Sequence, residues 1–140
     1  MAEVLGLIRV EFAYMDGVID PPSSMHQLTL ELLAAGPGEV WATGMPVVAC
    51  AVLTSKPGAL YIGKLAVAQA ARGRGMARAM IALAERRALE MGLDRLELQT
   101  RVELVANQAT FAAMGFTETG RTAHPGFDRP TTITYRRALG

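Results

Sequence analysis

The chain has 140 residues, of which 51% are hydrophobic and 19% are charged. This length suits one domain with its own apolar core, and this composition argues against disorder. The 14 Lys and Arg residues and the 13 Asp and Glu residues give a net charge of +1, which excludes a generally basic coat for nucleic acid. We therefore expect one domain over residues 1–140, with no nucleic-acid partner.

Residue types that bind metals are scarce. Cys50 is the single cysteine, so it forms no intrachain disulfide, and its apolar neighbours predict a core position. His26 and His124 are the two histidines, too few for a histidine-rich metal site. We expect no metal cofactor.

The sequence carries no signal for a membrane or for secretion. Its longest unbroken apolar run covers residues 47–53 and is far too short to span a bilayer. Glu3 and Arg9 interrupt the apolar stretch at the N-terminus, which argues against a secretory signal. We expect a cytoplasmic protein with no membrane partner.

The N-terminal part of the chain predicts two helices. Apolar residues at helical spacing indicate the first, over residues 2–15. Ser24 followed by Gln27 forms a capping box that opens the second, over about residues 25–35. Residues 36–38 read Gly-Pro-Gly and end it.

Three strands are expected next, in a meander. Residues 39–43 and 46–54 are rich in strand-forming side chains and flank Gly44-Met45, which indicates a hairpin. A turn at Lys56-Pro57-Gly58 leads into a third strand over 60–67.

The C-terminal half alternates helices and strands. A helix over 76–91 ends at a glycine, and a strand over 95–101 alternates apolar and polar residues. A short helix over about 104–114 and two strands over 117–121 and 131–137 follow. The strand–helix–strand unit over 60–101 makes two strands parallel. We therefore predict an α+β domain: a mixed, mostly antiparallel sheet with helices on both faces.

The turn between the third strand and the long helix predicts an anion site. Two glycines and three arginines gather there: Gly73, Gly75, Arg72, Arg74 and Arg78. Backbone N–H groups in the first turn of a helix lack partners and, with the helix dipole, attract anions. Glycine permits close approach of backbone to a ligand, and charge-assisted hydrogen bonds from guanidinium groups add about 1.5–3 kcal/mol each. This combination suits a phosphate or pyrophosphate.

Two common phosphate-binding motifs fit this turn poorly. A P-loop requires Lys and then Ser or Thr where Met76 and Ala77 stand, and the dinucleotide fingerprint requires Gly or Ala where Arg78 stands. Residues 72–77, Arg-Gly-Arg-Gly-Met-Ala, instead match the pattern Arg/Gln-x-x-Gly-x-Gly/Ala. With the preceding strand Lys64-Leu65-Ala66-Val67 and the later Gly115-Phe116, this stretch resembles the GNAT superfamily of N-acetyltransferases over about residues 39–137.

The resemblance implies a GNAT-like domain that uses acetyl-coenzyme A as acyl donor. It implies that the strand over 60–67 splays from its parallel neighbour, and that unpaired backbone groups there bind the pantetheine arm as an added strand does. Gly63 is compatible with a bulge at this place. The cofactor-binding residues that it implies are Leu65, Ala66, Val67, Arg72, Gly73, Arg74, Gly75, Met76, Ala77 and Phe111. Leu104 stands where the family usually has an asparagine, and Asn107, one turn nearer the Gly-Phe landmark, is a further candidate.

The resemblance does not by itself supply the catalytic groups. Members of the family often carry a proton-donating tyrosine four residues before the Gly-Phe landmark, where this chain has Phe111. Our candidate for the general base is His124, since its ordinary pKa suits the task; Glu103 and Asp20 are weaker candidates. We expect transfer of an acetyl group to a primary amine of a small molecule or protein. The alternative is a sensor that binds acyl-coenzyme A without turnover.

The first predicted element is a helix, whereas family members generally open with a strand. Two explanations stay open: the sheet lacks this edge strand, or Met1 is not the natural start of the chain. A sheet that lacks an edge strand exposes unpaired backbone groups, which invite pairing with another chain. We therefore expect a homodimer.

Overall fold

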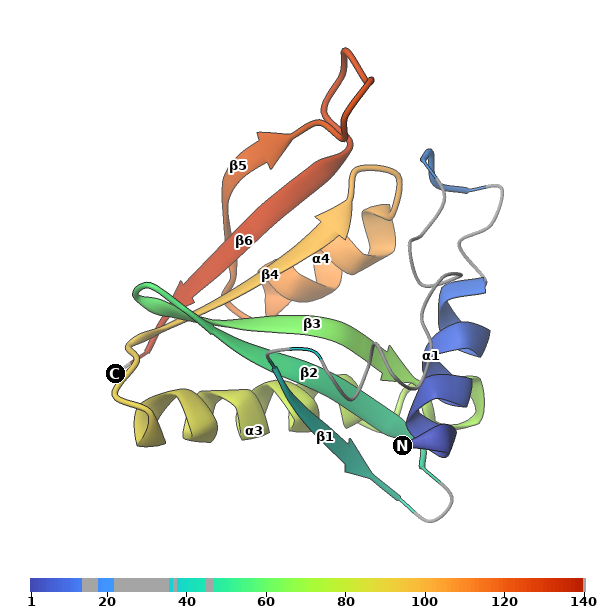
Figure 1. Ribbon diagram of the computed structural model, residues 1–140, viewed down its shortest axis with the longest axis vertical. Helices are drawn as coiled ribbons and strands as arrows, with labels where there is room; N and C mark the ends of the chain where they lie inside the picture. Colours follow the sequence, from blue (N-terminus) through green and yellow to red (C-terminus); the bar gives the residue numbers. More distant parts are fainter. Residues whose placement is uncertain (14–17, 22–35, 37, 45–46, 140) are drawn as a thin grey trace.

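The computed structural model describes residues 1–13, 18–21, 36, 38–44 and 47–139 (Figure 1). The predicted helix over 25–35 lies outside these residues. The helices and strands, in chain order, are α1 (Ala2–Ala13), β1 (Glu39–Thr43), β2 (Ala49–Lys56), β3 (Ala59–Val67), the 3-10 helix η2 (Gln69–Ala71), α3 (Met76–Glu90), β4 (Arg95–Arg101), α4 (Val105–Ala113), β5 (Thr117–Thr122) and β6 (Thr132–Ala138).

The strands form one sheet in the order β1-β2-β3-β4-β6-β5. β3 and β4 run parallel, and the other neighbours pair antiparallel. The mixed sheet predicted from the sequence is therefore confirmed. Strands β2 and β3 extend further toward each other than predicted, because the turn between them needs only Pro57 and Gly58, and Gly58 has a φ of 76° that favours glycine.

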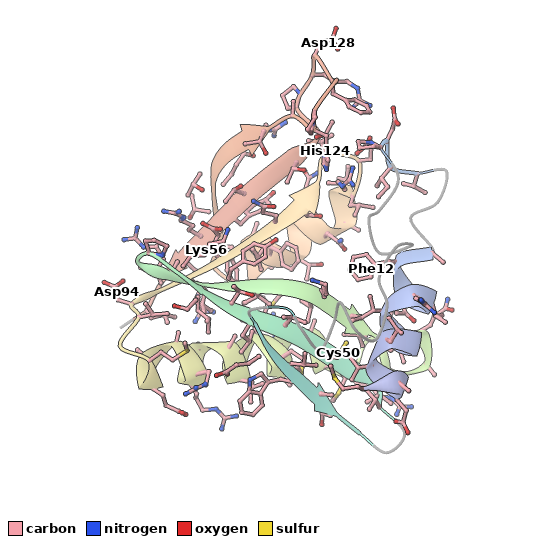
Figure 2. The ribbon with its side chains drawn as sticks, in the orientation of Figure 1. Phe12, Cys50, Lys56, Asp94, His124 and Asp128 are labelled. Carbon is pink, nitrogen blue, oxygen red and sulfur yellow. The ribbon has the colours of Figure 1, made fainter. Side chains whose placement is uncertain are left out.

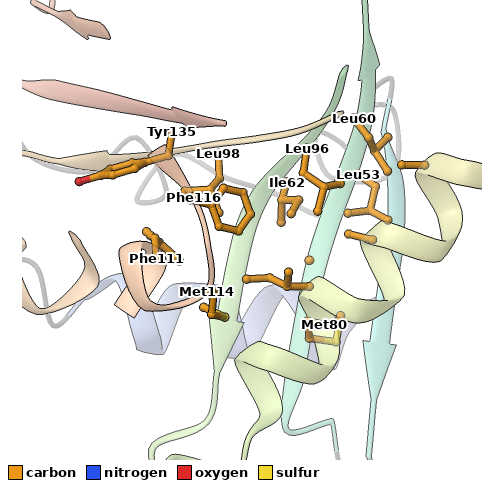
Figure 3. Packing of buried hydrophobic residues seen from close by; sticks show 14 of the residues in the cluster. Leu53, Leu60, Ile62, Met80, Leu96, Leu98, Phe111, Met114, Phe116 and Tyr135 are labelled. Carbon is orange, nitrogen blue, oxygen red and sulfur yellow. The ribbon is translucent and has the colours of Figure 1, made fainter. Parts of the chain in front are cut away.

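Helices cover both faces of the sheet, as expected (Figure 1). Alternate residues of β2 explain how, since neighbours in a strand point to opposite faces. Ala51 and Leu53 join the core with α3 and α4, whereas Cys50 and Val52 pack against α1. Figure 3 shows the larger of these cores, in which side chains of the sheet meet Met80 of α3 and residues of α4.

One further contact fixes the edge of the sheet. The Arg87 guanidinium of α3 donates two hydrogen bonds to the Glu39 carboxylate of β1, from Nε to Oε1 at 2.8 Å and from Nη2 to Oε2 at 2.7 Å. This bidentate pair, with a hydrogen bond from Trp41, lowers the pKa of Glu39 to about 2. The pair joins α3 to β1 across β2.

Candidate functional site

A fork between β3 and β4 opens the centre of the sheet. The two strands pair only at Leu60 with Leu96 and at Tyr61 with Glu97, and they diverge beyond that point (Figure 1). A cavity of about 770 Å³ lies there, lined by both diverging strands, by the ends of α1 and α3, and by α4. The expected splayed pair is therefore present, and it creates a site for a ligand.

The β3 side of the fork presents open backbone. Val52 pairs with Gly63 and Cys50 with Ala66, so Lys64 and Leu65 form a bulge, with Lys64 at a φ of 50°. This is the bulge expected near Gly63, although the left-handed backbone falls on the next residue.

The pairing of β3 with β2 fixes the direction in which the N–H group of Val67 points. Ala68 N donates to Val48 O, beside β2, at 2.7 Å. Successive N–H groups of a strand point to opposite edges, so the N–H of Val67 faces the fork. No β4 residue pairs with this part of β3, which leaves that group available to a ligand.

The turn that leads into α3 forms one end of the cavity. Gly73 and Gly75 have φ values of 78° and 75°, and a Cβ built on either would meet nothing within 4 Å. They are therefore required for the backbone conformation, and they leave open space beside it. Gly75 caps α3 without any side-chain hydrogen bond, so the first N–H groups of the helix are left for a ligand.

The three arginines of the turn differ in their places. Arg72 and Arg78 line the cavity, whereas Arg74 is not among its lining residues. The Arg72 guanidinium is paired with the carboxylate of Glu11 from α1. The Glu11 side chain is only 6% exposed and also lines the cavity. This ion pair joins the turn to α1 at the cavity wall.

Asn107 and Phe111 of α4 form another wall of the cavity. The Phe111 ring contacts the rings of Phe116 and Tyr135, with centroids 6.2 and 6.1 Å away. Phe111 is thus a core residue with one edge at the cavity, and it supplies no proton to a ligand there.

His124 lies in the loop between β5 and β6 and lines the same cavity (Figure 2). Its backbone N donates to Oγ1 of buried Thr131 at 3.0 Å, and its Nδ1 contacts that same oxygen. The Thr131 hydroxyl lies 3.4 Å from Thr122 O, to which it donates. When the Thr131 hydroxyl gives its proton to Thr122 O, the tautomer that fits is the one in which His124 Nδ1–H donates to Thr131 and the lone pair lies on Nε2.

Burial and then the charge of Arg101 lower the pKa of His124, against a smaller opposing effect of Glu103. Both changes favour the neutral imidazole. The imidazole ring is therefore uncharged at neutral pH and can accept a proton.

Glu103 and Asp20 are engaged away from the cavity. Asp20 N donates to Glu103 Oε2 at 3.2 Å, and the Arg129 guanidinium lies 3.2 Å from Asp20 Oδ2 and 3.8 Å from Glu103 Oε2. Neither carboxylate is among the cavity-lining residues. Their contacts attach the segment over 18–21 to the loops beside β4 and β6.

The fork thus brings together most of the predicted site residues. Those that line the cavity are Leu65, Ala66, Val67, Arg72, Gly73, Gly75, Met76, Ala77, Asn107, Phe111 and His124. That they bind a cofactor stays a prediction.

Sequence reasoning missed Glu11 and Thr100, which also line the cavity. A signal existed for Glu11, since helical spacing places it beside Ile8 on the apolar face of α1. Thr100 carried none, because it continues an ordinary alternation in β4.

Two absences concern the described residues. Among them, no group of three or more His, Cys, Asp or Glu side chains is placed to hold a metal ion. None of the helices in the described part of the chain has the length and apolar character needed to cross a membrane.

The comparisons with known proteins agree with this geometry. Residues 13–116 match the family model described as the acetyltransferase (GNAT) family. The match covers well over half of the chain, and the chain therefore belongs to the GNAT acetyltransferase family. This membership supports an acyltransferase activity. A search among curated proteins gave no significant match.

Solved structures share the fold. A GNAT-family acetyltransferase from Staphylococcus aureus has a TM-score of 0.74 at 18% identity, covering 99% of this chain and 92% of its own. The ribosomal-protein-S18-alanine N-acetyltransferase of Escherichia coli has a TM-score of 0.65 at 17% identity, covering 94% and 87%. A GNAT-family acetyltransferase from Elizabethkingia anophelis, with acetyl-CoA bound, has a TM-score of 0.64 at 16% identity, covering 79% and 84%. At these identities the likeness concerns the fold alone.

Proposed function

We propose that the chain is an acetyl-CoA-dependent N-acetyltransferase acting on a primary amine. The observation that carries the proposal is the fork between β3 and β4, which opens onto the uncapped N-terminus of α3. Binding of acetyl-CoA by a structural neighbour supports the choice of donor.

The residues of the cavity fit the parts of this donor. The N–H groups of residues 73–77 and the guanidinium of Arg78 suit a pyrophosphate, because they combine the helix dipole with a charged donor. The open edge of β3 at Leu65 and Val67 suits the amides of a pantetheine arm. Gly73 and Gly75 leave the space that a side chain would fill. Bound acetyl-CoA supplies an acyl group activated as a thioester.

The transfer requires a neutral amine. It forms a C–N bond, breaks the C–S bond, removes a proton from the nitrogen and leaves a thiolate that takes up a proton. A lysine-like amine with a pKa of about 10.4 costs about 4–5 kcal/mol to deprotonate at pH 7. In this proposal His124 Nε2 accepts the amine proton, and the hydroxyl of Thr131 orients the ring.

One observation favours a second candidate function. Phe111 offers no proton to the leaving thiolate, which is compatible with a sensor that binds acyl-CoA without turnover. An assay for release of free thiol from acetyl-CoA, with a panel of small amines and of peptides that have a free N-terminus as acceptors, distinguishes the enzyme from the sensor. Release with any amine supports the enzyme, and tight binding of acetyl-CoA without release over any amine supports the sensor.

Location and assembly are parts of the same proposal. We place the protein in the cytoplasm, where acetyl-CoA and amines are available. A homodimer is supported by the edges of the described sheet, since β1 and β5 each pair with one described strand and β5 is exposed along its length. Light scattering at two protein concentrations tests the dimer.

A further inference from the structure

Thr100 lines the fork and carries a buried hydroxyl. The residue is 7% exposed, and its Oγ1 finds no hydrogen-bond partner in the part of the chain that the structure describes. Burying a hydroxyl without a partner costs about 1–3 kcal/mol. Valine has nearly the same shape and would avoid that cost, so the hydroxyl calls for an explanation other than packing.

The strand register places Thr100 opposite the bulge of β3. The last parallel pair is Tyr61 with Glu97, and three further residues along each strand reach Lys64 and Thr100. On its other side β4 is fully paired, with Thr100 opposite Ile133 of β6. Thr100 therefore lines the open side of the fork, across from the β3 edge at Leu65 and Val67.

The surroundings strengthen any hydrogen bond made there. Ile62, Leu98 and Met114 line the same cavity, and all three are buried apolar side chains. Polar contacts gain strength in such a low-dielectric setting. A donor fixed beside buried apolar side chains is also an arrangement that stabilises negative charge developing on an oxygen.

We propose that Thr100 Oγ1 donates a hydrogen bond to the carbonyl oxygen of the acyl group, together with a backbone N–H of β3 near Val67. The proposal rests on the proposed function, because it takes the cavity to hold an acyl thioester. Negative charge builds on this oxygen as the amine nitrogen bonds to the carbonyl carbon. The C=O double bond then re-forms as the C–S bond breaks, and the charge leaves with the thiolate. Thr100 keeps its proton throughout, so it complements His124 and does not replace the acid missing at Phe111.

The direct test compares two ligands by calorimetry: acetyl-CoA, and S-ethyl-CoA, a thioether without the carbonyl oxygen. Wild type is expected to prefer acetyl-CoA, since both donors reach the carbonyl oxygen. Thr100→Val lowers this preference by about three- to tenfold, the usual worth of one hydrogen bond, and leaves the affinity for S-ethyl-CoA unchanged. Thr100→Ser keeps the preference of wild type. In the unliganded protein Thr100→Val unfolds at the same or a higher temperature than wild type, since it removes an unpaired hydroxyl.

Thr110→Val is the matched control. Thr110 also lines the cavity, but its hydroxyl already donates to Ala106 O at 2.9 Å, so the preference for acetyl-CoA is unchanged. An identical preference in Thr100→Val and wild type would overturn the role of Thr100 while leaving the proposed function standing. A wild type that binds neither ligand would overturn the proposed function, and the role of Thr100 with it.

Discussion

Removing the side chain of Arg72 while Glu11 stays in place is expected to destabilise the fold. The Glu11 carboxylate is 6% exposed and the Arg72 side chain is 50% exposed. Loss of one partner from a buried ion pair costs about 3–5 kcal/mol, because a charge is left in a poor environment. Since Arg72 is half in water, we expect about 2 kcal/mol for Arg72→Ala, roughly the middle of the range between a surface pair and a buried pair.

Thermal unfolding measures this effect. For a chain of this size, about 2 kcal/mol lowers the Tm by about 4–8 °C. The double variant Glu11→Gln/Arg72→Ala removes the buried charge as well, so it recovers at least half of the loss. Arg74→Ala is the control, because Arg74 is exposed and lies outside the cavity lining; its Tm stays near that of wild type.

Two results would contradict this role of the Glu11–Arg72 ion pair. In the first, Arg72→Ala and Arg74→Ala unfold at the same temperature, which would show that the ion pair contributes nothing to stability. In the second, the double variant is no more stable than Arg72→Ala, which would show that the cost does not come from the buried carboxylate.

Two further predictions concern pH. If His124 is the base, kcat/KM rises with pH through its pKa and then levels off; because burial and Arg101 lower that pKa, the rise lies below about pH 6.5. His124→Gln removes the rise and slows transfer by about a hundredfold or more, and a profile identical to wild type would dismiss His124 as the base. The bidentate pair of Glu39 with Arg87 lowers the pKa of Glu39 to about 2 from 4.5, so its contribution is complete above pH 4.5 and is lost as the pH falls toward 2. Because Glu39 is 39% exposed, Glu39→Gln lowers the unfolding free energy at neutral pH by less than about 1 kcal/mol. The difference from wild type shrinks in denaturant titrations below pH 4.5, and a difference that grows there would contradict the assignment.

The fold and the turn before α3 could be predicted because their signals are local. Alternation in β4 and helical spacing in α3 depend on neighbouring residues only. Gly73 and Gly75 indicated the turn between strand and helix, because glycine is the residue that adopts positive φ values without strain. Gly63 indicated a bulge, since glycine inside a strand is compatible with one; the strand pairing places the bulge next to it, at Lys64 and Leu65, with the positive φ on Lys64.

The contacts that complete the site could not be predicted, because they join distant parts of the chain. Glu11 and Arg72 are separated by 61 positions, and only the packing of α1 on the sheet brings them together. Thr100 is an ordinary strand residue in the sequence, and only the divergence of β3 from β4 places it beside a cavity. For Arg74 the sequence misleads in the other direction. It lies between Arg72 and Arg78 in the sequence, and both of these line the cavity, but Arg74 does not.

In the proposed function, the fork and the N-terminus of α3 receive the diphosphate and pantetheine of coenzyme A. This binding mode is tested by calorimetric titration of coenzyme A into wild type, Ala77→Glu and Ala79→Glu. Ala77 lies in the first turn of α3 and lines the cavity, whereas Ala79 is exposed and does not; both substitutions suit a helix. Ala77→Glu is expected to weaken binding by at least about tenfold through charge repulsion, and Ala79→Glu is expected to bind like wild type. Equal affinity in the two variants, or no binding by wild type, would contradict it.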